Sequence, residues 1–302
     1  MILITIWPIF AIICAGFVMA QRGFPEQAFW PAAEKVNYFL LFPALLVSSL
    51  ANAPIRDPAL LQLGLAAALT IGVATAGLAI YRRIRPMPAA RFGPAVQGVV
   101  RINTYLGLAI TAGLAGQVGL GRAAVLLAFV VPLVNVISII ALTDEGPARQ
   151  PRRMIAMMLR NPLIIACIIG IFVSATGLGL PFGLGRFFAL LGQGSLPLGL
   201  LCVGAALRPA ALRQDWRALS GNSAVRLLAM PVLALGVARV FGLGEVETLV
   251  LVIFSAIPTA PTAYVLTRQF GGDGTFMAGL VTAQTMASVV TIPVMLLILG
   301  LG

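Results

Sequence analysis

Polar side chains interrupt one of the most apolar regions of the chain. Residues 98–110 read GVVRINTYLGLAI, and Arg101 lies about nine residues into an apolar stretch at 92–115. At 1.5 Å per residue of helix, this depth is roughly 13 Å, close to the midplane of a bilayer. A guanidinium there costs about 2.5 to 3.5 kcal/mol on insertion scales, so it normally faces a water-filled cavity or a partner.

No acidic side chain is expected deep enough in the membrane to neutralise Arg101. An anionic substrate could therefore supply the missing negative charge. Two other interpretations stay open: Arg101 could bind exposed carbonyl groups of a broken helix, or its side chain could extend to the cytoplasmic surface. All nine acidic residues fall in predicted connections or at the ends of predicted helices: Glu26, Glu34, Asp57, Asp144, Glu145, Asp215, Glu245, Glu247 and Asp273.

A second interrupted segment lies far along the chain. The sequence IPTAPTAY at 257–264 carries Pro258 and Pro261 inside another apolar stretch, and each proline removes a backbone hydrogen bond. Two broken helices at corresponding places would expose amide N–H groups and helix N-termini, which favour a carboxylate. Three amide side chains in other stretches are added, because a bulky amide needs several partners or a wet cavity. The predicted substrate site comprises Arg101, Asn103, Thr104, Tyr105, Pro258, Thr259, Pro261, Thr262, Tyr264, Asn37, Asn135 and Gln284.

The elements that position these residues are predicted to be membrane-spanning helices. The hydrophobic fraction is 60% and the charged fraction only 10%, more apolar surface than a water-soluble core can use. Apolar runs of about 20 residues cross lipid as helices, because the backbone must satisfy its own hydrogen bonds there. Ten such stretches predict an all-α integral membrane protein: 2–20, 33–53, 59–81, 92–115, 121–143, 161–177, 186–207, 223–242, 247–268 and 275–301. No basic segment precedes the first stretch, so we expect a permanent helix rather than a secretory signal.

The two halves of the chain are expected to repeat one another in inverted orientation. A polar segment at 143–153 separates five predicted helices from five more, and an odd number turns the second half upside down. The same interval of 35 residues separates Pro8 from Pro43 and Pro162 from Pro197, in the first two helices of each half. The predicted domains are a first five-helix repeat at 1–143, a cytoplasmic connection at 144–160 and a second, inverted repeat at 161–302.

The net charge of +11 does not indicate a nucleic-acid partner, because its distribution follows the predicted connections. By the positive-inside rule, the arginine-rich connections are cytoplasmic, which places both termini outside the cell inner membrane. These arginines are Arg82, Arg83, Arg85, Arg91, Arg149, Arg152, Arg153, Arg160, Arg208, Arg213 and Arg217. The chain contains no His, which argues against a metal site or hydrolytic catalysis. The unpaired spacing of Cys14, Cys167 and Cys202 predicts small buried hydrophobic side chains.

Five segments along essentially the whole chain resemble the auxin efflux carrier family, which includes plant PIN-type carriers and bacterial permeases for malonate or malate. The segments are NYFLLFPALLVSSL (37–50), GVVRINTYLGLAI (98–110), RNPLIIACIIGIFVSATGLGLP (160–181), LPLGLLCVGAAL (196–207) and AIPTAPTAYVLTRQFGGD (256–273). The resemblance implies ten helices in two inverted repeats, with helices 4 and 9 broken where they cross. It also implies a scaffold of helices 1, 2, 6 and 7 and a transport domain, helices 3–5 and 8–10, that moves like an elevator. Plant carriers have a proline at the crossing of helix 4, and this chain has none there, which leaves the break point open.

We therefore expect a secondary transporter, not an enzyme, that moves a small organic anion, a mono- or dicarboxylate, across the lipid bilayer. No cofactor is expected; the absence of a deep membrane carboxylate favours uniport, and coupling to sodium or protons stays open. The resemblance is compatible with a homodimer through the scaffold helices. A sensor or channel-like protein without stoichiometric transport is the alternative, and an intramembrane enzyme is a more distant one.

Overall fold

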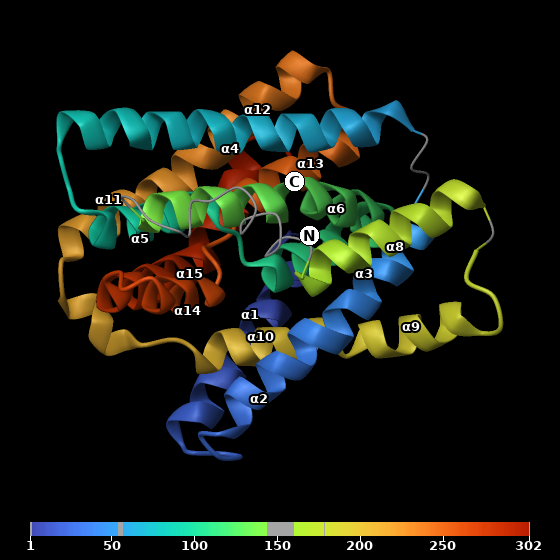
Figure 1. Cartoon of the computed structure of the whole chain (residues 1–302), viewed down its shortest axis with the longest axis horizontal. Helices are drawn as coiled ribbons and strands as arrows, with labels where there is room; N and C mark the ends of the chain where they lie inside the picture. The colour runs from blue at the N-terminus through green and yellow to red at the C-terminus, as the bar shows by residue number, and fades with distance from the viewer. Residues whose placement is uncertain (1, 54–56, 144–159, 178, 302) are drawn as a thin grey trace.

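The chain folds into packed helices. The computed structural model describes residues 2–53, 57–143, 160–177 and 179–301, and all regular structure within them is helical (Figure 1). Six segments are long and apolar enough to cross a membrane: Ile2–Gln21, Pro58–Ile84, Ala89–Leu142, Leu184–Ala205, Trp216–Phe241 and Gly274–Ile298. The prediction of an all-α membrane protein is therefore confirmed. Residues 144–159 of the predicted cytoplasmic connection lie outside the described residues.

Several of the membrane-length segments are built from consecutive helices. In Figure 1, α4 and α12 lie along one edge of the view and α2, α9 and α10 along the opposite edge. In chain order the helices are α1 (Ile2–Gln21), α2 (Phe29–Val36), η1 (Asn37–Leu41), α3 (Phe42–Ala51), α4 (Pro58–Ile84), α5 (Ala89–Val100), α6 (Thr104–Leu142), α8 (Pro162–Thr176), α9 (Leu184–Gln193), α10 (Ser195–Ala205), η3 (Pro209–Arg213), α11 (Trp216–Ala224), η4 (Val225–Ala229), α12 (Met230–Phe241), α13 (Glu245–Ala256), α14 (Thr262–Gln269) and α15 (Gly274–Ile298).

The long helix α6 is bent into two parts at Gly116. The backbone of Gly116 has φ 57° and ψ −149°, a conformation that a residue with a Cβ rarely adopts. The bend falls in the interval 116–120 that separates two of the predicted stretches. The two parts of α6 therefore correspond to two successive predicted helices.

The two predicted interruptions are present, and they meet. The helix α5 ends at Val100 and α6 begins at Thr104, while α13 ends at Ala256 and α14 begins at Thr262. The backbone N–H of Asn103 donates to the carbonyl oxygen of Pro258 at 2.9 Å. The first break therefore lies at residues 101–103, and this hydrogen bond joins it to the second break. The absence of a proline had left the position of the first break open.

The helices pack in two groups that share α6. In the first group α1 packs on α10, and α3 packs on both α8 and α9. In the second group α4 packs on α6 and α12, α12 packs on α13, and α15 contacts α5, α11 and α14. The helix α6 also contacts α1, α3, α8 and α10, so the contact between the groups runs along the segment that carries the first break.

Glycines bring the backbones of α1 and α10 into close contact. A Cβ added to Gly204 would clash with the carbonyl oxygen of Ile13 and would lie 2.7 Å from the backbone nitrogen of Phe17. A Cβ added to Gly16 would clash in the same way with the backbone of Leu201. Small residues at such crossings allow the close van der Waals packing that holds membrane helices together.

We expect Gly204→Leu to prevent stable folding. Backbone atoms of α1 cannot move aside as a flexible side chain can, so the helices must separate, at a cost above the usual overpacking range of about 1–3 kcal/mol. The matched control is Gly77→Leu, because Gly77 lies in α4 with no heavy atom within 4 Å of an added Cβ. Size-exclusion chromatography and thermal unfolding in detergent should show aggregation only for Gly204→Leu; equal behaviour of the two variants would contradict the prediction.

Candidate functional site

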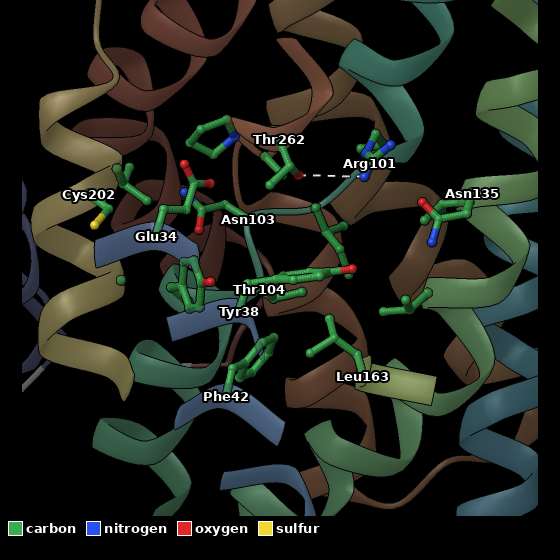
Figure 2. Close-up of a pocket in the computed structure, with 18 of the residues that line it drawn as sticks. Glu34, Tyr38, Phe42, Arg101, Asn103, Thr104, Asn135, Leu163, Cys202 and Thr262 are labelled. Carbon is green, nitrogen blue, oxygen red and sulfur yellow. Dashed lines mark hydrogen bonds between the residues drawn. The ribbon is translucent and has the colours of Figure 1, made fainter. Parts of the chain in front are cut away.

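A cavity of about 130 Å³ lies at the meeting point of the two broken helices (Figure 2). Its walls come from α2, η1 and α3, from the two breaks, and from α6, α8 and α10. The cavity therefore faces both helix groups. Seven of the predicted site residues line it: Arg101, Asn103, Thr104, Tyr105, Asn135, Pro261 and Thr262.

Arg101 enters this cavity with donors to spare. Its Nη1 lies 3.4 Å from Oε1 of Gln97 and its Nη2 lies 3.5 Å from Oγ1 of Thr262, the pair joined by the dashed line in Figure 2. Both distances exceed those of strong hydrogen bonds, and a guanidinium has five N–H donors. Across the described part of the chain, no carboxylate forms an ion pair with Arg101. The positive charge is left without an anionic partner.

Asn103 adds a second unmet donor. Its side chain caps α6, with Oδ1 accepting from the backbone N–H of Leu106 at 3.2 Å. The residue is only 1% exposed, and its Nδ2 has no hydrogen-bond partner in the described structure. A buried donor without an acceptor costs about 1–3 kcal/mol. A ligand oxygen or a water molecule in the cavity would remove this cost.

Three helix N-termini border the same cavity. The helix α6 begins at Thr104, α14 begins at Thr262, and α8 begins directly after its cap Asn161, whose Oδ1 accepts from the backbone N–H of Leu163 at 2.9 Å. N–H groups in the first turn of a helix have no partner within that helix, and each N-terminus carries a partial positive charge. Together with Arg101 they make this side of the cavity electropositive.

Five of the predicted site residues lie outside the cavity. Asn37 is fully buried, where its Nδ2 donates to the carbonyl of Ser195 at 3.0 Å and its Oδ1 accepts from the hydroxyl of Ser195 at 2.8 Å. Gln284 accepts from the backbone N–H of Thr259 at 2.9 Å and donates to the carbonyl of Gly98 at 3.0 Å. Helix-to-helix hydrogen bonds therefore satisfy both amides. Pro258 and Thr259 form the crossing itself, and Tyr264 lies beside the neighbouring cavity.

Arg226 is buried at the crossing and was not among the residues predicted from the sequence. It is 1% exposed and donates to three carbonyl oxygens, those of Val99 at 2.8 Å, Phe254 at 2.8 Å and Ile257 at 2.7 Å. These carbonyls belong to the C-terminal ends of α5 and α13, where a positive charge is stabilising. The role of binding the carbonyls of a broken helix, considered above for Arg101, thus belongs to Arg226.

Glu34, which the sequence placed at the end of a predicted helix, lines the same cavity as Arg101. The predicted stretch began at residue 33, which placed Glu34 at a helix end, but α2 begins at Phe29 and carries Glu34 in its second turn. Glu34, Tyr38 and Phe42 follow one another at intervals of four residues and line the cavity together. This spacing, typical of one helix face, is the sequence signal that could have found them.

A wider cavity of about 490 Å³ adjoins the first one. The two share Glu34, Cys202 and Pro261 in their walls. Arg208 and Tyr264 also line the wider cavity, and the guanidinium of Arg208 lies 4.8 Å from the centre of the Tyr264 ring. The wider cavity also reaches the end of α1, where Ala20 and Gln21 line it, and we call this wider cavity the vestibule.

The three cysteines are free, and only two of them are buried. Cys167 and Cys202 are buried as predicted, whereas Cys14 is exposed on α1. The buried face of α1 carries Ile6, Phe10 and Ile13, and Cys14 points away from it. The prediction of burial is therefore wrong for Cys14.

Comparison with known proteins agrees with these features. A family model described as "Membrane transport protein" matches residues 147–296. An "Uncharacterized transporter" of Methanothermobacter thermautotrophicus is 22% identical over 292 residues, which cover 96% of this chain and 95% of that protein. With the long apolar helices, these matches define a multi-pass membrane transporter. These matches confirm the resemblance to the auxin efflux carrier family, a family of membrane transporters.

Proposed function

We propose that the protein is a secondary transporter that moves a small organic anion, a mono- or dicarboxylate, across the cytoplasmic membrane by elevator-type alternating access. One observation carries the choice of an anion. The guanidinium of Arg101 lies in a cavity at a helix crossing, beside the unmet donor of Asn103, and no described carboxylate pairs with it. A substrate carboxylate would fit this guanidinium, because an arginine and a carboxylate can form two parallel hydrogen bonds.

The volume of the cavity supports a small substrate. An apolar cavity of about 150 Å³ accepts benzene, and the space here is about 130 Å³. A solute of about six non-hydrogen atoms is thus near the limit. Larger acids would need the vestibule or a movement of the walls.

An ion triad at one end of the helix bundle supports the inverted repeat. Nε of Arg122, in α6, lies 2.6 Å from Oε1 of Glu247 in the first turn of α13. Nη2 of Arg122 lies 3.2 Å from Oδ2 of Asp57, the N-cap of α4. The triad ties three helices of the second packing group together.

A second triad at the opposite end has the same construction. Nη1 of Arg91, in the first turn of α5, lies 2.7 Å from Oδ2 of Asp273, the N-cap of α15. Arg91 also pairs with Asp215, the N-cap of α11, and its guanidinium lies 3.5 Å from the centre of the Phe276 ring. This triad ties α5, α11 and α15 together.

The two triads correspond to one another residue by residue. In the predicted repeat, the third, fourth and fifth helices of the first half match the third, fourth and fifth of the second. Asp57 matches Asp215 at an interval of 158 residues, Arg91 matches Glu247 at 156, and Arg122 matches Asp273 at 151. Each triad therefore takes one arginine and two acids from corresponding places. This symmetry supports two inverted five-helix repeats and a single transport body made of the six helices that the triads join.

The position of the cavity fits an elevator movement. Glu34, Tyr38 and Phe42 come from the first packing group, which we assign to the scaffold, and Arg101 and Thr262 come from the transport body. Sliding of the body would carry Arg101 past this scaffold face. With the arginine-rich helix ends in the cytoplasm and both termini outside, the vestibule beside Arg208 opens to the cytoplasm.

A counterflow assay in proteoliposomes tests the proposed function. Vesicles loaded with malonate, malate or an aromatic acid should accumulate the same labelled acid for at least one of the three, and neutral analogues should not exchange. The assay is run with and without a sodium or pH gradient, which also tests the coupling. Exchange of no anion would contradict the proposal, and flux that does not saturate would favour a channel.

We expect Glu247→Gln to lower stability by about 2 kcal/mol, because it leaves the charge of Arg122 half paired in a poorly exposed place, where the side chains are 14% and 8% exposed. The matched control is Glu245→Gln, in the same turn of α13 but exposed and outside the triad. Thermal unfolding in detergent should separate the two variants. Equal melting temperatures would show that the triad does not hold the body together.

A further inference from the structure

The carboxylate of Glu34 is a charged group for which the mechanism above has no use. The residue is half-buried in the second turn of α2. Within the described residues, its side chain accepts no hydrogen bond and forms no ion pair. It lies in the walls of both the substrate cavity and the vestibule. The carboxylate is therefore exposed to a solute in either space.

Glu34 faces the same small space as Arg101 but does not neutralise it. Figure 2 shows the two side chains on opposite sides of the cavity, with Asn103 and Thr262 between them. Their charged atoms are further apart than the 4.0 Å of an ion pair. The cavity therefore presents donors at one side and a strong acceptor at the other.

We infer that the substrate carries a hydrogen-bond donor, a hydroxyl or an ammonium group, in addition to its carboxylate, and that Glu34 selects for this donor. The inference rests on the proposed function and specifies the substrate of the same site. An ionised carboxylate can only accept hydrogen bonds. A plain alkyl acid would bring its own negative charge near Glu34 without offering it a donor, and like charges within about 4–6 Å repel.

A donor at the far end of the substrate removes this conflict. A hydroxyl gives Glu34 a charge-assisted hydrogen bond, which is about twice as strong as a neutral one. An ammonium group also cancels its charge, so that a zwitterion would match the one arginine and the one glutamate of the cavity. Both are small enough for the space of about 130 Å³.

Three acids with the same carbon chain test the inference. Propionate has no donor, 3-hydroxypropionate has a hydroxyl and β-alanine has an ammonium group. Counterflow with the wild-type protein should favour at least one of the two donor-bearing acids over propionate by about 10- to 100-fold in kcat/KM, the range of a hydrogen bond to a charged group. The arm that is favoured identifies the donor.

Two variants attribute this preference to Glu34. Glu34→Ala should reduce the preference to about one, because the acceptor is gone. Glu34→Gln keeps an uncharged acceptor, so it should retain part of a hydroxyl preference and lose an ammonium preference. Glu26→Gln, at an exposed position before α2, is the control and should keep the wild-type preference.

Two results would overturn the inference and leave the proposed function standing. One is equal exchange of all three acids by the wild-type protein, at a rate above that of vesicles without the protein. The other is a wild-type preference that persists in Glu34→Ala and Glu34→Gln, which would mean that another group reads the donor. Exchange of no anion at all would instead remove the proposed function.

Discussion

Arg101→Ala is expected to abolish anion uptake in proteoliposomes and to leave the protein folded and inserted. The guanidinium has only two long contacts to neighbouring side chains, at 3.4 and 3.5 Å, so its loss removes little from the fold. The substrate carboxylate loses a bidentate, charge-assisted partner, which predicts a fall of at least about 100-fold in kcat/KM. Counterflow of the best substrate measures the loss, and thermal unfolding in detergent measures the fold.

Two further variants make this result specific. Arg101→Lys keeps the charge but not the planar pair of donors, so transport should be partly retained. Arg83→Ala removes an exposed arginine at the end of α4 and should transport like the wild-type protein. Unchanged uptake by Arg101→Ala would show that the arginine does not bind the substrate.

The interruptions of the two crossing helices could be predicted because their causes are local. Two prolines mark the second break, and a charged and polar run inside an apolar stretch marks the first. Their meeting was implied by the resemblance to the auxin efflux carrier family, and the hydrogen bond from Asn103 to Pro258 confirms it. Local chemistry and the family resemblance were sufficient for this part of the fold.

The functions of the buried amides could not be predicted from the sequence. Asn37, Asn135 and Gln284 were equivalent in the sequence, as bulky polar groups in apolar stretches. Only Asn135 lines the cavity, while helix contacts satisfy the other two. Which neighbour satisfies a buried amide depends on tertiary packing, and the sequence of its own helix does not determine that packing.

Glu34 was misjudged because helix ends are the least certain part of a prediction. Apolar length placed the start of the second stretch at residue 33, and the helix starts four residues earlier, at Phe29. That shift moves the carboxylate from the end of a helix into its second turn, where it lines the cavity. A small error of boundary thus changed the expected chemistry of the site.

Arg226 carries the same sequence signal that identified Arg101 as a candidate. Like Arg101, it is an arginine inside a predicted span, near the start of the stretch at 223–242. Depth alone cannot say whether such a charge faces a substrate or the backbone. The structure separates them, because Arg226 is saturated by three carbonyls and Arg101 is not.

Arg226→Leu is expected to destabilise the fold strongly. The change leaves the carbonyls of Val99, Phe254 and Ile257 without their buried donor. At about 1.5–3 kcal/mol for each hydrogen bond to a charged group, the loss is roughly 5 kcal/mol or more, comparable with the whole stability of many proteins. It also removes the positive charge that stabilises two helix C-termini. We expect a fall of about 10 °C or more in the apparent melting temperature.

The same experiment separates the two buried arginines. Arg226→Lys keeps the charge on a single nitrogen that cannot reach three carbonyls in the geometry of a guanidinium, so its melting temperature should lie between those of the wild-type protein and Arg226→Leu. Arg239→Leu, at an exposed position in α12, is the matched control and should unfold near the wild-type temperature. A wild-type melting temperature for Arg226→Leu would contradict the prediction. If Arg101→Ala is inactive but folded while Arg226→Leu unfolds, then one arginine of the crossing serves the substrate and the other holds the two broken helices together.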